Sequence, residues 1–226
     1  MKTYSTLILD YYKQLNAPGN LPPEVSVMNP YANSNTFDIA AKFYTKYYND
    51  TEKRYICFGI NPGRFGAGVT GVPFTDPVLL ETSCGIQNDF EKKAELSSRF
   101  IHEMIFAYGG PLAFFSKYYI SAVSPLGYLK DGINLNYYDI KGFKPMFEEY
   151  VVEQIEKQLQ FGIDRQVAYS IGKGQNIKYL NHINNKYGFF DRIIPLSHPR
   201  WVMQYRLKRK QEFIEEYVDA FASNEG

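Results

Sequence analysis

The chain has 226 residues, of which 45% are hydrophobic and 17% aromatic, and its formal net charge at pH 7 is +1. This length predicts a single domain over residues 1–226, with enough apolar side chains for a sizeable core. The near-zero charge excludes a whole-protein electrostatic argument for nucleic-acid or membrane binding, so any such surface must be a local basic patch.

Helices and strands are predicted in alternation along the chain. Apolar residues at helical spacing predict helices over about 3–15, 36–48, 87–108 (in one or two pieces), 144–161 and 204–220, and another from the GKGQN stretch to about 186. Short apolar runs predict strands over 54–60, 118–123, 166–171 and 191–196. Residues 16–35, rich in Pro and Asn, predict an extended loop.

This alternation predicts an α/β fold, a three-layer sandwich with a central, mainly parallel four-stranded sheet flanked by helices. In such sheets the ligand crevice lies at the carboxyl ends of the strands. Four loops with unusual residues are expected to meet there, over residues 61–76, 122–134, 172–176 and 197–206. The sequence therefore predicts one functional edge of the sheet.

Cysteine and histidine usage gives no indication of a metal site. Two cysteines, Cys57 and Cys84, are too few for a four-thiolate zinc or iron–sulfur site, and the three histidines lack metal-ligand spacing. The chain also has neither a run of 18 apolar residues nor a signal peptide. We expect a cytoplasmic protein that needs no metal or other cofactor, has no membrane contact and acts as a monomer.

The stretch "GINPGRFGAGVTGVPF", residues 59–74, follows directly on the first predicted strand. Its glycines would let backbone N–H groups approach an anion, as in nucleotide-binding loops. The spacing fits neither GxxxxGK[ST] nor GxGxxG, and Pro62 and Pro73 remove two N–H donors. A phosphate loop is therefore the weaker interpretation of this stretch.

The same stretch resembles the first motif of the uracil-DNA glycosylase superfamily, and it is most similar to the single-strand-selective monofunctional (SMUG-like) branch, whose loop is approximately G-M-N-P-G-x-F-G-x-x-x-T-G-V-P-F. "LSHPR", residues 196–200, resembles the second motif of the superfamily. The resemblance covers residues 54–205 and leaves the first 50 residues without a motif. It implies a monofunctional DNA glycosylase of base excision repair, which hydrolyses the N-glycosidic bond of uracil or a related damaged base and leaves an abasic site.

The resemblance also implies roles for individual residues. Asn61 matches the residue that places the attacking water, and His198 matches the donor that stabilises the departing base. Phe74 matches the aromatic that stacks on the flipped base. The backbone around the base would come from Gly59, Ile60 and Gly63. Because no Lys stands at a matching catalytic position, strand cleavage through a Schiff base is not expected.

One position departs from the branch and leaves the preferred base open. Ala122 aligns with an Asn that reads the uracil edge in the branch, and an Ala side chain cannot hydrogen-bond a base. Ser124 could substitute in part, or Asn134 or Asn136 could swing in from the following loop. The same fold acting on xanthine or 5-hydroxymethyluracil is therefore an alternative.

The second motif continues differently from the family pattern, with Arg200 and Trp201. Either residue could fill the gap left by the flipped base, Arg200 could instead bind phosphate, and Trp201 could instead cap the last helix. Arg206, in the basic stretch 206–210, and Lys173 are further candidates for phosphate contact with DNA.

Two interpretations from other functional classes remain open. One is a catalytically silent DNA-binding protein that senses damage, and the other is an enzyme acting on small nucleosides or nucleotides. The presence of both Asn61 and His198 disfavours the sensor, which needs neither residue. The basic stretch and Trp201 disfavour the nucleoside enzyme.

Overall fold

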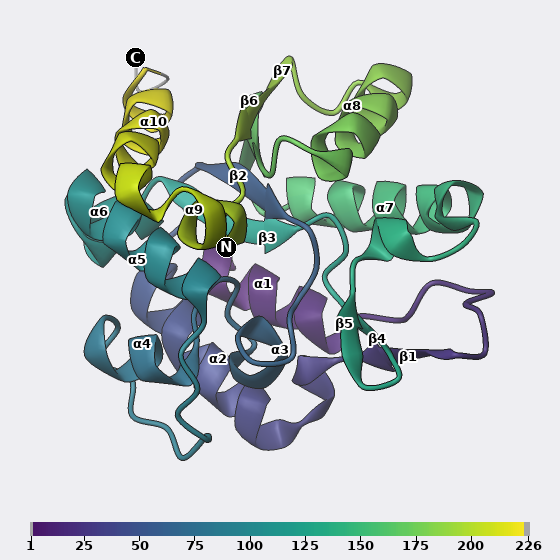
Figure 1. Cartoon of the computed structure of the whole chain (residues 1–226), viewed down its shortest axis with the longest axis horizontal. Coiled ribbons are helices and arrows are strands. Elements are labelled where there is room, and N and C mark those ends of the chain that lie inside the picture. Colours follow the sequence, from purple (N-terminus) through teal and green to yellow (C-terminus); the bar gives the residue numbers. More distant parts are fainter. Residues whose placement is uncertain (1, 224–226) are drawn as a thin grey trace.

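The computed structural model describes residues 2–223 and contains a central sheet of four parallel strands in the order β3-β2-β6-β7 (Figure 1). The strands are β2 (Arg54–Gly59), β3 (Tyr118–Ala122), β6 (Ile163–Ile171) and β7 (Arg192–Leu196). All four strands predicted from the sequence are present, and the predicted α/β fold class is confirmed. Ile56, Cys57 and Phe58 of β2 are buried in succession, because helices cover both faces of the sheet.

Neighbouring tyrosines of β3 show how the layers are arranged. The Tyr118 ring packs on Phe221 of α10 (Lys210–Ala222), with ring centroids 4.5 Å apart. The Tyr119 ring points to the opposite face and packs on Tyr4 of α1 (Tyr4–Lys13), at 5.8 Å. The first face is also covered by α5 (Leu96–Tyr108) and α6 (Pro111–Phe115), and the second by α2 (Ser34–Tyr47) and α7 (Phe143–Leu159).

A second, antiparallel sheet of three short strands was not predicted. Its order is β1-β4-β5, with β1 (Val25–Met28), β4 (Gly127–Lys130) and β5 (Ile133–Leu135). Loops were expected over most of these residues, because strands of three or four residues give no readable alternation. The Asp131-Gly132 turn, with positive φ at both residues, joins β4 to β5 and was the available hairpin signal.

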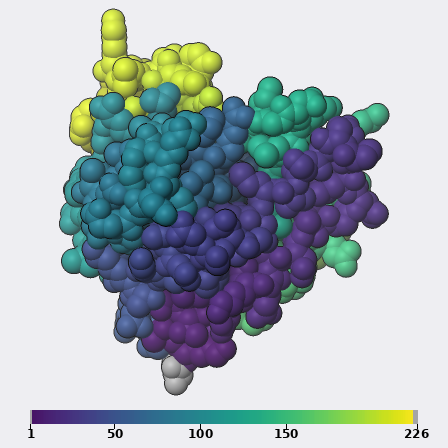
Figure 2. Space-filling view, turned by 90° about the horizontal axis from the view of Figure 1, so that it is seen from below, coloured from purple at the N-terminus to yellow at the C-terminus, as the bar shows by residue number. Residues whose placement is uncertain are grey.

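The N-terminal segment, which no motif covers, is an integral part of the fold. Tyr12 of α1 lies in the core, where its hydroxyl is 3.0 Å from that of Tyr119. Figure 2 shows the purple N-terminal residues beside the blue and teal residues of the following segment. None of the helices within residues 2–223 is both long and apolar enough to cross a bilayer.

Two predicted helices differ from the observed ones. Helix α5 begins at Leu96 rather than near residue 87, because the Glu95 N–H donates to the Asp76 carboxylate (2.9 Å) instead of to a preceding helical carbonyl. The last predicted helix, 204–220, starts too early: its first two residues end a separate helix, α9 (Pro199–Tyr205), a 3₁₀ turn follows at Leu207–Arg209, and α10 begins only at Lys210. Residues 199–205 are thus helical rather than a loop.

Arg54, at the start of β2, is buried and links several elements. Its guanidinium donates to both carboxylate oxygens of Asp50 at 2.7 Å and to the Phe115 carbonyl at 2.8 Å. It also lies over the rings of Tyr4 and Tyr48, at 4.7 and 4.9 Å from their centroids. One buried cation therefore links α1 to the amino-terminal end of β2.

We expect Arg54→Met to lower the free energy of unfolding by about 3 kcal/mol, because carbonyl oxygens buried around the guanidinium would lose their donor. Asp50→Asn is the matched control and should cost less, about 1 kcal/mol, since the Asp50 side chain is 41% exposed and can be hydrated. Urea denaturation of both variants measures the difference. Equal losses would show that the ion pair, and not the burial of the guanidinium, is what matters.

Candidate active site

The loops that follow β2 and β3 stay paired beyond the end of the sheet. Val123 N–H donates to the Gly59 carbonyl at 3.0 Å, and Ser124 N–H donates to the Ile60 carbonyl at 3.1 Å. Asn176, in the first turn of α8 (Gln175–Tyr187), adds a donor to the Gly59 carbonyl at 3.4 Å. These bonds fix the start of the glycine loop at the carboxyl edge of the sheet, where a cavity of about 300 Å³ opens.

Most of the predicted site residues meet at this cavity. Its lining includes Gly59, Ile60, Asn61, Gly63, Phe74, His198 and Arg200. Ala122 also lines it, as do Asn134 and Asn136 of the segment that follows β4. Among the described residues, the remaining predicted ones lie outside the lining, namely Ser124, Lys173, Trp201 and Arg206.

The Asn61 side chain is held in one orientation by the segment that follows β5. Its Nδ2 donates to the Leu135 carbonyl at 3.2 Å, and its Oδ1 accepts from the Tyr137 N–H at 3.0 Å. The reversed amide would place N–H against N–H and oxygen against oxygen, so the assignment of the two atoms is unambiguous. The amide oxygen keeps one lone pair for a further partner.

Phe74 lies directly against the backbone of Gly59. A Cβ at residue 59 would be 2.9 Å from Cε2 of the Phe74 ring, so any side chain there would displace the ring. Phe74 has a φ of +51°, which is unfavourable for a bulky residue. The buried hydroxyl of Thr70 stabilises the turn, since it accepts from the Val72 N–H at 3.1 Å and donates to the Thr75 carbonyl at 2.7 Å.

His198 caps the N-terminus of α9, and this role fixes its tautomer. Its Nδ1 accepts from the Arg200 N–H at 3.2 Å, so Nδ1 carries no proton in this bond. Burial, and secondly the Arg200 guanidinium, lower the pKa of His198 to about 4. At neutral pH the ring is therefore uncharged, and its proton is on Nε2 as a hydrogen-bond donor.

The prediction that Ser124 reads the base is wrong. Ser124 is completely buried, and its hydroxyl is engaged with the Tyr128 hydroxyl at 2.8 Å and the Leu126 carbonyl at 3.2 Å. In the segment that follows, Asn134, Asn136 and Tyr138 are the residues with polar side chains that line the cavity. Asn134 accepts from the Arg64 N–H at 3.1 Å, and Asn136 donates to Asp139 at 2.7 Å.

Glu95 lines the cavity and was missed by the sequence analysis. Its carboxylate accepts from the Ser98 hydroxyl at 3.0 Å and lies so close to Gly66 that a Cβ there would clash with it. Burial, and further the charge of Asp76, raise the pKa of Glu95, whereas Ser98 and Arg200 oppose this shift. No motif marks Glu95, and only tertiary contacts bring it to the glycine loop.

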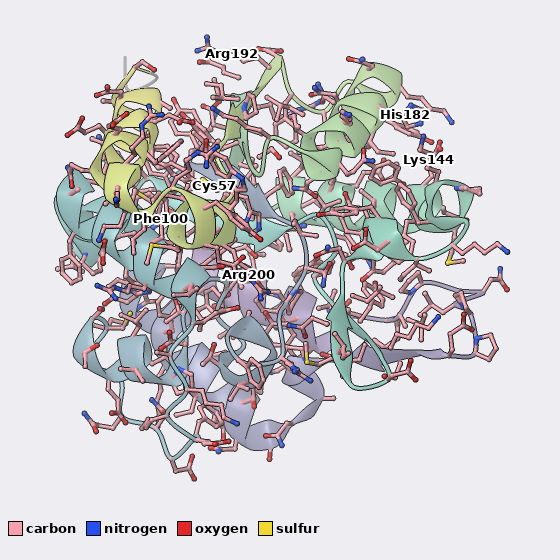
Figure 3. The ribbon with its side chains drawn as sticks, viewed as in Figure 1. Cys57, Phe100, Lys144, His182, Arg192 and Arg200 are labelled. Carbon is pink, nitrogen blue, oxygen red and sulfur yellow. The ribbon has the colours of Figure 1, made fainter. Side chains whose placement is uncertain are left out.

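The residues predicted to contact DNA differ in how far their side chains are engaged within the protein. Arg200, labelled in Figure 3 near the centre of the view, is exposed in the first turn of α9 at the cavity. Trp201 is 39% exposed; its ring packs edge-on against Phe213 at 5.7 Å, and the Arg206 guanidinium lies 4.8 Å from it. Lys173 instead forms an ion pair with Glu216 at 2.8 Å.

No group of three or more His, Cys, Asp or Glu side chains within residues 2–223 is arranged to hold a metal ion. The cavity volume lies at the lower end of the range for small-ligand sites, which suits a single flat base. An exposed arginine and a neutral histidine donor that line one cavity of this size are features expected of a DNA glycosylase.

Comparisons with known proteins agree with this class. The model of the uracil DNA glycosylase superfamily matches residues 45–222. Among solved structures, the wild-type SMUG2 of Pedobacter heparinus is 42% identical with a TM-score of 0.95, and the match covers 99% of this chain and 98% of that one. None of the curated proteins matches the chain. The chain belongs to the uracil-DNA glycosylase superfamily, and its resemblance to the SMUG-like branch is confirmed.

We expect the His198 ring to stay neutral down to about pH 5 and to gain a second proton only near pH 4, because burial disfavours the charged ring. Long-range ¹H–¹⁵N NMR correlations should show the Nε2–H tautomer above that pH, with His198→Gln identifying the signals. Arg200→Gln keeps the backbone N–H and removes a positive charge, so it should raise the midpoint without changing the tautomer. A wild-type midpoint near 6.5 would contradict the burial argument.

Proposed function

We propose that the protein flips uracil out of DNA into the cavity and hydrolyses its N-glycosidic bond, with Asn61, His198 and Phe74 as the residues that act on the base and the water. The superfamily membership and the structural match to SMUG2 support a monofunctional uracil-DNA glycosylase. The alternatives of a silent damage sensor and a nucleoside enzyme are not needed. We further propose that the protein acts as a monomer on chromosomal DNA.

The neutral, Nε2-protonated His198 in the cavity is the observation that most supports this reaction. When the bond between C1′ and N1 breaks, its electron pair stays on the base and negative charge develops on the O2 carbonyl oxygen. A preorganised N–H donor aimed at this oxygen stabilises the charge in the transition state. A neutral imidazole is a suitable donor, because it stabilises the anion without having to give up its proton.

Asn61 supports the second half of the reaction, the addition of water to C1′. Its amide is held by Leu135 and Tyr137, and the free lone pair of Oδ1 can accept a hydrogen bond from water. A positioned water converts the attack on the oxocarbenium-like sugar into an effectively intramolecular step. Phe74 would offer the departing pyrimidine a ring face for stacking.

A cleavage assay tests the proposal. Labelled oligonucleotides with one uracil, single- and double-stranded, are incubated with excess enzyme and then treated with alkali to break abasic sites. We expect wild type to cut both kinds at uracil and not without alkali, His198→Ala to lose roughly 10²–10³-fold in rate, and Asn61→Ala to lose about 10²-fold.

The matched control for Asn61→Ala is Arg64→Gln. The Arg64 side chain donates to the Gly132 carbonyl and thus also ties the glycine loop to the β4–β5 hairpin, but it does not line the cavity. This variant should keep most of the activity. If it loses as much as Asn61→Ala, the amide acts by holding the hairpin rather than by placing water. Absence of any cutting by wild type would reject the proposed reaction.

Salt dependence tests the proposed DNA surface. Arg200→Gln and Arg206→Gln should each weaken DNA binding and reduce the slope of log K against log salt by about 0.7–0.9, if each residue contacts one phosphate. Lys173→Gln is the control, because Lys173 already pairs with Glu216 and should change the slope less. Each of the three substitutions is combined with Asn61→Ala, so that the DNA stays uncut while its binding constant is measured at several salt concentrations. Unchanged slopes for both arginine variants would exclude this surface.

A further inference from the structure

Glu95 is the only carboxylate among the described residues that line the cavity. Its backbone is fixed, because its N–H donates to Asp76, whose other carboxylate oxygen accepts from the Val78 and Leu79 N–H groups of α4 (Pro77–Thr82). Within residues 2–223, the hydrogen-bond donor to the Glu95 side chain is the Ser98 hydroxyl, which donates to Oε2 of Glu95. The other oxygen, Oε1, faces the glycine loop, 3.4 Å from where a Cβ of Gly63 would lie.

The two glycines under this carboxylate show that its position is built into the loop. A side chain at Gly66 would collide with Oε2, and one at Gly63 would come into contact with both Glu95 and the Asn134 amide. Gly63 is only two residues from Asn61 and lines the same cavity. The glycine loop therefore accommodates a charged group in the cavity that also holds the residue proposed to place the water.

The proposed reaction leaves one proton without an acceptor. Water that adds to C1′ must lose a proton, and an amide such as Asn61 cannot take it, since its oxygen is only a hydrogen-bond acceptor. His198 does not take it either, because its Nδ1 is occupied by the Arg200 N–H and its Nε2 already holds a proton. Among the described residues that line the cavity, the carboxylate of Glu95 is the remaining base.

We propose that Glu95 is a catalytic residue that receives the proton of the attacking water and, as an anion, stabilises the cationic sugar. This inference rests on the proposed glycosylase reaction. The C1′–N1 bond breaks with its electrons on the base, the water oxygen bonds to C1′, and one water proton passes to Glu95. The base anion takes up a proton from solvent, Glu95 then releases its own to solvent, and the products are an abasic site and the free base.

The charges around Glu95 are consistent with a base of moderate strength. Asp76 faces it from α4, Ser98 from its own helix, and Arg200 from α9. Burial and Asp76 raise its pKa from the usual value of 4.5, and Ser98 and Arg200 limit the rise. The raised pKa means that the Glu95 carboxylate accepts a proton more readily than an exposed glutamate does.

The pH dependence of single-turnover cleavage on a uracil oligonucleotide tests the inference. Because Glu95 must be ionised, the rate should fall as pH drops through its raised pKa. Glu95→Gln keeps the size of the side chain and the bond from Ser98, and it should lose about 10²-fold or more in rate at pH 7 together with this acid limb. Ser98→Ala removes a contact that lowers the pKa of Glu95, so it should keep the carboxylate and move the acid limb to higher pH.

Each outcome decides the question. A Glu95→Gln enzyme with wild-type rate and pH profile overturns the inference, while uracil cleavage by wild type would still support the proposed function. If Glu95→Gln does not fold, as judged by thermal unfolding, the acid limb of Ser98→Ala decides, because a structural role predicts no shift. No cleavage by wild type at any pH would reject the function itself and, with it, the inference.

Discussion

The hydrogen bonds between the Asn61 amide and the backbone of residues 135–137 are the constraint on which the site depends. They join the loop after β2, which belongs to the parallel sheet, to the strand β5 of the small antiparallel sheet. The amide is thus oriented before any substrate arrives, and two segments that line the cavity are held together. A side chain that must act with defined geometry is most effective when its neighbours leave it no other rotamer.

The glycines of this loop make room for other side chains of the protein as well as for any bound base. The ring of Phe74 lies on the backbone of Gly59, and the carboxylate of Glu95 lies on that of Gly66. A loop with ordinary side chains at these positions could not be approached so closely. Three segments therefore meet around the cavity, namely the glycine loop, the start of α5 and the β4–β5 hairpin. Their side chains supply both polar and apolar parts of its lining.

The central sheet and the two motifs could be predicted because they depend on local signals. Buried strands leave unbroken apolar runs such as that around Cys57, and the motif residues follow strand ends. The antiparallel sheet could not be found in the same way, since its strands have at most four residues and form only because they pair with each other. Ser124 and Glu95 were misjudged for a related reason, because orientation and tertiary proximity decide whether a side chain reaches the cavity.

The participation of β1 in this antiparallel sheet has a consequence for how such enzymes can diverge. Met28 of β1 packs against the backbone at Gly68 in the glycine loop and at Gly127 in β4, so the N-terminal segment braces the wall from outside. Substitutions in β1 can shift that wall without touching either motif. Strand β1 is therefore a place where selection, or a directed-evolution library, can adjust the surroundings of the pocket while the residues of both motifs are kept.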